Sequence, residues 1–337
     1  MGRKTKTALI VAAILLVAGA LTGGIGYLIW DQKWDTLQNM QMAKVVQKEY
    51  ASSSESLNLI DIDTKNTRIS LIPTDAMEVS LSYQTSEEED YTISEQSGTL
   101  KVLYAEKDMP WYRKYGWNLG WLSPKPARDM IVYVPQDYQG DLILKTTNQQ
   151  IVVEDFAGIE NLTAVSSNAA ITCTNLSANG NLELLTSNAP IALINIDAKG
   201  EINVQTSNAK IQITGALGNQ VTAQSSNGSC ELKQIEVEGA ICIQTKNGAV
   251  ILEEAVGTRI WADTSNAKII AERIRASEIE LSTKNENIEG SIVGAQEDYQ
   301  IIASAKNGKN TLGEKNTGNK KLHITTKNGD IQMEFVR

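Results

Sequence analysis

The sequence contains one histidine, His323, and three cysteines, Cys173, Cys230 and Cys242. A Ser-His-Asp relay, a Cys-His pair or a multi-histidine metal centre would therefore depend on one imidazole. An odd number of cysteines, without the spacing of zinc ligands, indicates neither a disulfide framework nor a metal site. We predict no cofactor and no metal, and most hydrolase chemistries are disfavoured.

A basic stripe is also lacking. The 337 residues include 31 Lys and Arg against 40 Asp and Glu, which gives a formal net charge of -9. The basic side chains are interspersed with the acidic ones, whereas a nucleic-acid-binding domain concentrates them on one face. The composition therefore predicts no nucleic-acid partner.

Long apolar runs are absent except near the N-terminus. A basic tail, residues 1–7, precedes an uncharged apolar stretch at 8–30, which is long enough as a helix to cross a bilayer core of about 30 Å. Residues 18–20, Ala-Gly-Ala, have the form of a signal-peptidase site, so a cleaved signal peptide is the alternative. The apolar stretch continues past them to Trp30 and Trp34, which favours an uncleaved single-pass anchor with the basic end in the cytoplasm. The remainder is then expected outside the cell membrane.

Residues 31–56 are expected to form a juxtamembrane stalk and linker. Residues 31–50 lack Gly and Pro and place apolar side chains near a helical stripe, which predicts a short helix. The Ser-rich segment 51–56 is expected to be a linker.

The dominant feature is a repeat of about twenty residues marked by asparagine. Its copies include SSNAAI, TSNAPI and TKNGAV. A repeat of this length predicts a solenoid, in which each coil buries its apolar face only by stacking on its neighbours. The asparagines recur at spacings of 19 to 22 residues after the first regular coil, with one copy far upstream, and are Asn66, Asn148, Asn168, Asn188, Asn208, Asn227, Asn247, Asn266, Asn285, Asn307 and Asn328.

Aligned on the asparagine, the coils show rows of similar residues. The residues six and four positions before it are aliphatic or Ala, the residue two before is Thr or Ser in nine of ten coils, and an apolar row resumes three positions after it. A period of two predicts a strand before the turn and another after it. Stacked turn asparagines can hydrogen-bond along the array, and we also expected them to adopt a left-handed backbone. The predicted fold is all-β, a parallel β-solenoid with an asparagine ladder, preceded by one transmembrane helix.

The N-terminal part interrupts the repeat. Residues 57–140 are expected to hold the first coils and a cap, and 141–337 the regular solenoid. Around Ser97 the sequence predicts a weaker coil, with Ser97 in place of the asparagine. An acidic tip at 87–90 and an aromatic stretch at 109–126 are expected to be insertions.

The repeat pattern, the VYVP segment that leads into it and the preceding apolar stretch resemble the LiaG-like "putative adhesin" β-strand-repeat family, over residues 57–337. The resemblance implies a parallel β-helix outside the cell membrane, in some cases linked to cell-envelope stress, and brings no catalytic residues. Ala follows the asparagine in several coils where Gly is usual in the family, which leaves the turn type open.

A carbohydrate-cleaving β-helix would require clustered carboxylates on adjacent coils. The outward row three positions before the asparagine contains one carboxylate, Asp263. Glu183, Trp261, Glu280 and His323 lie in another outward row, where we expect them to be well separated among neutral residues. Glu253 and Glu254 adjoin, but neighbouring strand residues are expected to face opposite ways. We predict that the protein is not an enzyme.

Binding is the function that the sequence favours. A row of Gln and Ser residues, with Trp261 beside it, is expected to form a flat polar surface that could contact a glycan or a protein, or remain solvated. The aromatic insertion is the second candidate, either a binding site or a cap for the first coil. Its candidate residues are Trp111, Tyr112, Arg113, Tyr115, Trp117 and Trp121.

The sequence therefore predicts a single-pass, membrane-anchored solenoid for adhesion, binding or scaffolding at the bacterial cell envelope. The expected partners are the cell membrane, through the N-terminal helix, and a cell-wall glycan or an envelope protein. The alternatives are an envelope-stress accessory protein, a carbohydrate-active enzyme and a polymerising structural protein. The sequence leaves the oligomeric state open.

Overall fold

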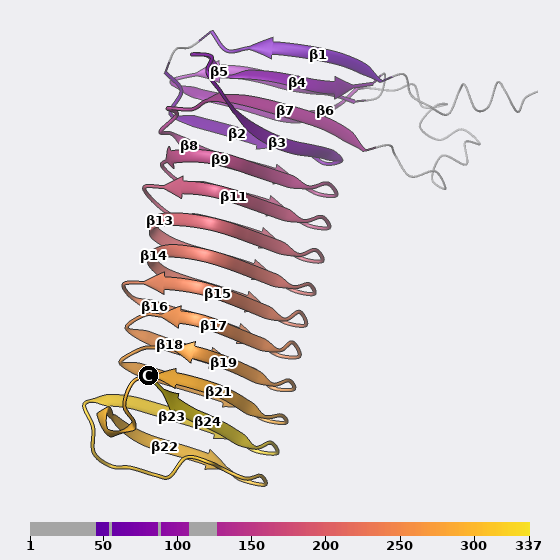
Figure 1. Cartoon of the computed structure of the whole chain (residues 1–337). Helices are drawn as coiled ribbons and strands as arrows, with labels where there is room; N and C mark the ends of the chain where they lie inside the picture. The colour runs from indigo at the N-terminus through magenta and orange to yellow at the C-terminus, as the bar shows by residue number, and fades with distance from the viewer. Residues whose placement is uncertain (1–44, 54–55, 87–88, 108–126) are drawn as a thin grey trace, which may run out of the picture. The chain divides into compact units, whose positions relative to one another are not determined.

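A computed structural model describes residues 45–53, 56–86, 89–107 and 127–337. Of these, 47–85, 89–106 and 127–337 belong to one compact unit. This unit is the predicted parallel β-solenoid, with stacked coils that narrow to a tight turn along one edge (Figure 1). The predicted transmembrane segment, 8–30, and the aromatic insertion residues lie outside the described residues.

The solenoid is built almost entirely from strands, with one short 3₁₀ helix, η2 (Gln296–Asp298). The strands are β1 (Val46–Ala51), β2 (Leu59–Asp63), β3 (Thr67–Thr74), β4 (Ser80–Thr85), β5 (Glu89–Gln96), β6 (Thr99–Glu106), β7 (Arg128–Pro135), β8 (Asp141–Thr146), β9 (Ile151–Ile159), β10 (Leu162–Ser166), β11 (Ile171–Ala178), β12 (Leu182–Thr186), β13 (Ile191–Thr206), β14 (Ile211–Ser225), β15 (Cys230–Val237), β16 (Ala240–Thr245), β17 (Val250–Val256), β18 (Arg259–Asp263), β19 (Ile269–Ile274), β20 (Glu278–Thr283), β21 (Ile288–Val293), β22 (Tyr299–Ala305), β23 (Lys320–Thr326) and β24 (Ile331–Val336).

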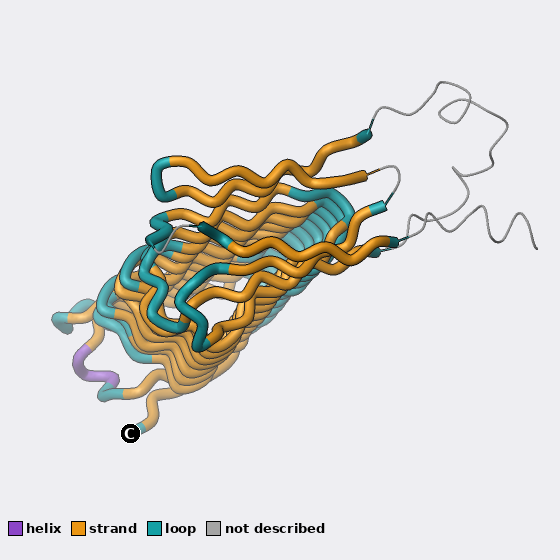
Figure 2. Tube along the Cα trace, turned by 90° about the horizontal axis from the view of Figure 1, so that it is seen from above, coloured by secondary structure: helices purple, strands orange, loops and turns teal. Residues whose placement is uncertain are grey.

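Each regular coil contributes one strand before its asparagine and one after it. We call the strands before the asparagine the first face and those after it the second face. Equivalent residues pair in parallel from coil to coil, so that Leu162 pairs with Leu142 on one side and with Leu182 on the other. The aliphatic rows predicted to point inward are buried in every regular coil. Viewed from above, the coils superpose around this narrow core (Figure 2).

The N-terminal end contains antiparallel strands, which the sequence did not predict. On the first face, β6 pairs in parallel with β2, and β5 pairs antiparallel with β6. On the second face, β7 pairs in parallel with β3, β4 pairs antiparallel with β7, and β1 pairs with β4. Antiparallel strands therefore cover both faces of the first coils.

The weaker coil predicted around Ser97 is wrong. Ser97 and Gly98 have φ angles of 51° and 76° and form the two-residue connection between β5 and β6, where Gln96 pairs with Thr99. Two consecutive positive φ values are typical of the tight hairpin turn that suits the twist of antiparallel strands. Ser97 is therefore a hairpin residue with no place in the asparagine ladder.

The helix predicted for residues 31–50 is wrong where the structure describes it, because 46–51 form strand β1. Its side chains reach β4 and β5: Gln47 donates a hydrogen bond to Ser82, and Lys48 forms an ion pair with Asp90 at 2.7 Å. These contacts with neighbouring strands stabilise an extended segment, whereas no described helix is available for a helical segment to pack against. No helix among the described residues is long and apolar enough to cross a bilayer.

The acidic tip expected at 87–90 also differs from its prediction. Glu89 is 2% exposed and forms an ion pair with Arg128, which is 4% exposed. Glu89 begins β5 and Arg128 begins β7, so the pair joins the two strands next to the segments that the structure does not describe. Two of the four acidic residues, Glu89 and Asp90, are thus partners of basic groups within the fold.

The C-terminal end is closed by a reversal of coil order. Strand β22 forms the outermost layer of the first face, and β23 inserts between β22 and β20. On the second face, β24 pairs with β21 (Figure 1). The last repeat in the sequence is therefore internal in the stack. The segment after β22 covers the open edges instead, with Lys315 bonded to Ile301 and Thr311 to Ile331.

Candidate binding groove

A buried row of hydroxyl groups shapes the turns of all but one of the regular coils. The Thr or Ser two positions before the asparagine is buried and donates a hydrogen bond to a carbonyl of a turn. Thr245 donates to the carbonyl of Gly228 at 3.1 Å and accepts from the amide of Gly248 at 3.2 Å. The hydroxyl thus satisfies turn groups that strand pairing leaves free, except in the coil of Asn307, where the residue is Ala305.

The asparagine side chains form one continuous ladder. From Asn148 onward, each Nδ2 donates to the Oδ1 of a neighbouring coil over distances from 2.6 to 2.8 Å. The left-handed backbone expected at these residues is wrong, since none of them has a positive φ. Gly is required after the asparagine in some coils by close packing, because a Cβ on Gly228 would lie 1.6 Å from the carbonyl oxygen of Ala209.

The left-handed residues lie in a second row, seven positions after the asparagine. Asp155, Asn175, Asn195, Gly215, Gln234, Glu254 and Arg273 have φ angles from 51° to 69°. This conformation bends each strand of the second face and turns two successive side chains outward. Glu253 and Glu254 are therefore both exposed, which corrects the expectation that they face opposite ways. Both are surface charges with cationic partners, Lys233 and Arg273.

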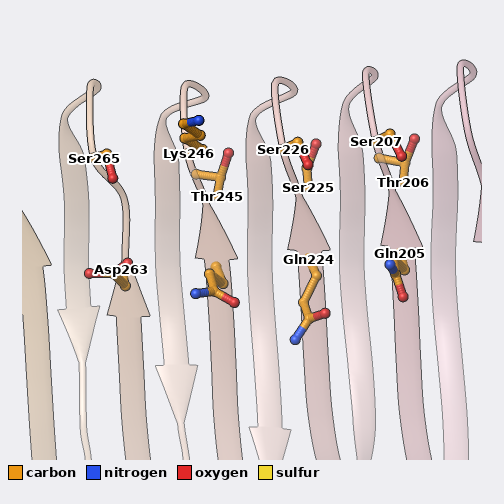
Figure 3. Close-up of a pocket in the computed structure, with 11 residues that line it drawn as sticks. Gln205, Thr206, Ser207, Gln224, Ser225, Ser226, Thr245, Lys246, Asp263 and Ser265 are labelled. Atoms are coloured by element: carbon orange, nitrogen blue, oxygen red, sulfur yellow. The ribbon is translucent and has the colours of Figure 1, made fainter.

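The first face carries a polar groove beside the turns. It has a volume of about 330 Å³ and crosses four coils, with one wall of turn residues and a floor of strand residues (Figure 3). The floor is Gln205, Gln224, Gln244 and Asp263, which are the middle of the outward Gln and Ser row of the sequence. The turn side is Thr206, Ser207, Ser225, Ser226, Thr245, Lys246 and Ser265.

The floor of the groove differs from the asparagine ladder in its hydrogen bonding. Every ladder amide is bonded to another amide, whereas the side chains of Gln205, Gln224 and Gln244 make no hydrogen bond to any described residue. Asp263 has no ion pair within the described part of the chain. The groove thus presents three primary amides and one carboxylate that are available to a ligand.

Trp261 lies outside this groove, in the next outward row. It pairs in register with Cys242 on one side and with Glu280 on the other. Because β23 inserts beside β20, Glu280 is also in register with His323. The expectation that Trp261, Glu280 and His323 are well separated is therefore wrong. His323 and Glu280 line a second, smaller hollow of about 190 Å³, together with the exposed Ile302.

Neither hollow has the features of a metal or nucleophilic site. No group of three His, Cys, Asp or Glu residues within the described ranges could hold a metal ion. Cys173 and Cys230 are buried in the core, and burial raises the pKa of both thiols to about 12, so they are protonated at neutral pH. Cys242 is a partly exposed free thiol whose pKa burial also raises.

The site residues expected in the aromatic insertion, Trp111 to Trp121, lie outside the described residues. Sequence reasoning found the Gln row of the groove but missed its wall of turn hydroxyls. The signal was present, because the residue directly before the asparagine is Ser in most coils that line the groove. The pairing of Glu280 with His323 in register had no such signal in the sequence.

Comparisons with known proteins agree with the repeat. A family model described as Toastrack DUF4097 matches residues 57–336. A comparison with curated proteins found no match.

Three solved structures are similar over most of their length. A putative adhesin from Bacteroides fragilis NCTC 9343 is 10% identical, with a TM-score of 0.32, and the match covers 86% of this chain and 97% of that one. A putative adhesin from Parabacteroides merdae ATCC 43184 is 14% identical, with a TM-score of 0.27 and coverage of 88% and 98%. A putative cell adhesion protein from Clostridium sporogenes ATCC 15579 is 7% identical, with a TM-score of 0.21 and coverage of 87% and 100%. With TM-scores this low, the fold described above rests on the strand pairing of this chain.

Proposed function

Because the chain belongs to the Toastrack DUF4097 family, a family defined by its domain and not by an activity, we propose a function from the surface of its own solenoid. The protein is a non-catalytic binding module of the bacterial cell envelope. Its polar groove holds an extended polymer, a cell-wall glycan, along the axis of the stack.

The observation that carries this proposal is the set of unbonded amides in the groove. Gln205, Gln224 and Gln244 pair in register on adjacent strands, about 4.8 Å apart. A primary amide offers two donors and an acceptor, so three of them in a row match the hydroxyl groups that recur along a glycan. An extended ligand would meet the same chemistry at each coil.

The carboxylates of the groove support binding over hydrolysis. Glycoside hydrolysis requires two carboxyl groups that flank the scissile bond, and Asp263 is the only carboxylate that lines the groove. On the second face, the carboxylate of Glu231 is engaged with Lys210 and Lys233. The family match brings no catalytic residue either.

The proposal includes a membrane anchor. The basic residues 1–7 and the apolar stretch 8–30 support a single-pass helix with the solenoid outside the membrane, in keeping with the narrower LiaG-like resemblance. Protease added to cells whose wall has been removed but whose membrane is intact checks this directly. We expect the protease to degrade the solenoid, while an N-terminal tag stays protected until the membrane is lysed.

Binding of soluble peptidoglycan fragments to the full-length chain tests the groove. We expect Gln224→Ala with Gln244→Ala to weaken binding about tenfold, because each lost hydrogen bond contributes about 0.5–1.5 kcal/mol. The matched control is Gln212→Ala with Gln332→Ala, which removes two outward amides from the second face. Equal affinities for the two double variants would contradict the assignment.

A further inference from the structure

The reversed coil order at the C-terminal end brings three lysines into one row. Lys284, Lys327 and Lys306 each stand directly before a ladder asparagine, at the tip of the turn. Asn328 donates from its backbone amide to the carbonyl of Lys284, and Asn307 donates in the same way to that of Lys327. The three lysines therefore occupy three consecutive coils, although 43 residues separate Lys284 from Lys327 in the sequence.

The same row is the wall of the polar groove. Going along the stack from the groove, the residues before the asparagine are Ser207, Ser226, Lys246 and Ser265, all of which line it. Lys284, Lys327 and Lys306 continue that wall beyond the groove. The wall thus changes from hydroxyl groups to ammonium groups in the direction of the C-terminal end.

The lysine row lacks the carboxylate partners that several lysines of the second face have. On the second face, Lys233 contacts Glu231 and Glu253, and Lys268 contacts Glu289 at 3.5 Å. Lys284, Lys327 and Lys306 are exposed and form no ion pair with a described residue. Strand spacing places their Cα atoms about 4.8 Å apart, so adjacent ammonium groups repel one another unless an anion lies across them.

We propose that this lysine row binds a linear polymer that carries repeated phosphate groups, which extends from the groove along the turn tips. The inference rests on the proposed function of the groove and names the class of its ligand. Lysine is a point charge on a flexible stem and suits phosphates of variable position, whereas a site for planar carboxylates favours the fork of arginine. The row contains no arginine. Asp263, on the floor of the groove, directs the phosphates toward the turn tips.

Inorganic polyphosphate of long chain length is the probe, with the full-length chain in a nonionic detergent. We expect Lys284→Ser, Lys306→Ser and Lys327→Ser together to weaken binding by at least tenfold and to lower its salt dependence. Serine is the residue at the same position of neighbouring coils, so the triple variant is expected to unfold at the wild-type temperature. The control triple variant is Lys145→Ser, Lys199→Ser and Lys321→Ser, which removes the same charge from exposed lysines without an ion pair to a described residue and is expected to change binding less than twofold.

Asp263→Asn tests whether the carboxylate on the floor of the groove repels the phosphates. The variant removes this negative charge and is expected to strengthen polyphosphate binding two- to threefold. A stronger effect of the control triple variant than of the row variant would overturn the proposal, as would unchanged binding by the row variant. Binding to phosphatidylglycerol micelles in preference to polyphosphate would overturn it as well, since it would identify the row as a lipid contact.

Peptidoglycan fragments without phosphate separate this inference from the proposed function. The row variant is expected to bind these fragments like the wild type, whereas the Gln224 and Gln244 double variant is not. If the row variant keeps its polyphosphate affinity while the double variant loses the fragments, the phosphate proposal fails and the groove proposal stands. If the double variant binds the fragments normally, the groove proposal fails regardless of polyphosphate.

Discussion

The two ends of the solenoid cover their exposed strand edges in different ways. A parallel stack exposes unpaired backbone groups and apolar side chains at each end, which invites further chains to add. At the N-terminal end, strand direction changes, and β4 and β5 run antiparallel to the strands that they cover. At the C-terminal end, direction is kept but order is reversed, so that β23 lies inside β22.

The difference shows at which end outward side chains remain available for binding. The N-terminal end uses charged and aromatic side chains for closure, including the buried pair of Glu89 and Arg128. The C-terminal end reuses ordinary repeats for closure, and its outward rows remain available for other contacts. The lysine row and the pairing of Glu280 with His323 in register both arise there, from coils that are distant in sequence.

Removal of residues 319–337 is expected to have the largest effect, because it takes an internal layer out of the stack. Leu322, Ile324 and Ile331 are fully buried, and full burial of an aliphatic side chain contributes about 1.5–3 kcal/mol. We expect the free energy of unfolding to fall by about 5 kcal/mol or more, measured by denaturant unfolding. Removal of the chain through Ala51, which takes β1 from the described residues, serves as the comparison, because four of the six residues of β1 are exposed and none is buried. Equal losses would show that both ends are ordinary edges.

Arg128→Met is expected to be the next largest effect. It leaves Glu89 buried without its cation, and breaking a buried pair costs about 3–5 kcal/mol. Adding Glu89→Leu to Arg128→Met should recover most of that loss. Arg68→Met is the matched control, because Arg68 and Asp129 form an exposed pair that contributes about 0–1 kcal/mol. Similar melting temperatures for Arg128→Met and Arg68→Met would refute the role assigned to the buried pair.

Asparagine substitutions compare the middle of the ladder with its C-terminal end. Asn208 donates to Asn188 and accepts from Asn227, whereas Asn307 makes one ladder bond, to Asn328. At about 0.5–1.5 kcal/mol for each bond, Asn208→Ala is expected to cost about twice as much as Asn307→Ala. Chemical denaturation of both variants gives the ratio, and a larger loss for Asn307→Ala would contradict an additive ladder.

The smallest expected effect is the pH dependence that Tyr50 contributes at the N-terminal end. Burial and a hydrogen bond to Glu95 raise the pKa of Tyr50 to about 12, against about 10 for an unfolded tyrosine. Because the folded state favours the protonated phenol, its contribution to stability is complete below pH 10 and is lost as the pH rises from about 10 to about 12. The fall in melting temperature between about pH 10 and about pH 12 should therefore be smaller for Tyr50→Phe than for the wild type. An unchanged alkaline profile would show that Tyr50 does not carry this effect.

The fold could be predicted because the sequence repeats about every twenty residues and each repeat forms one coil. Every regular coil repeats the same inward rows, so Leu162, Leu182 and Ile202 identify a stacked core before any coordinates are known. The row of left-handed residues was also readable in principle. Asp155, Asn175, Asn195 and Gly215 are residue types that tolerate a positive φ, and they recur at one offset from the ladder.

Features that depend on spatial order could not be predicted. The copies that contain Asn307 and Asn328 have equivalent motifs, so the sequence does not state which one stacks on the coil of Asn285. Ser97 followed by Gly98 is a turn signal, yet the surrounding apolar residues fit a coil as well as a hairpin. The groove floor followed from its row, whereas the lysine row required the stacking order of the last two coils.

The reversed order of the last two coils also constrains how the protein is made. Residues 299–305 leave the ribosome before 320–336, but in the finished stack the later segment lies inside the earlier one. A coil laid down as soon as it is synthesised would occupy the place that β23 must take. Strand β22 must therefore stack after β23 has been synthesised, or separate from β20 to admit it. Along the regular coils the order of stacking follows the order of synthesis, whereas for the last two coils the two orders are opposite.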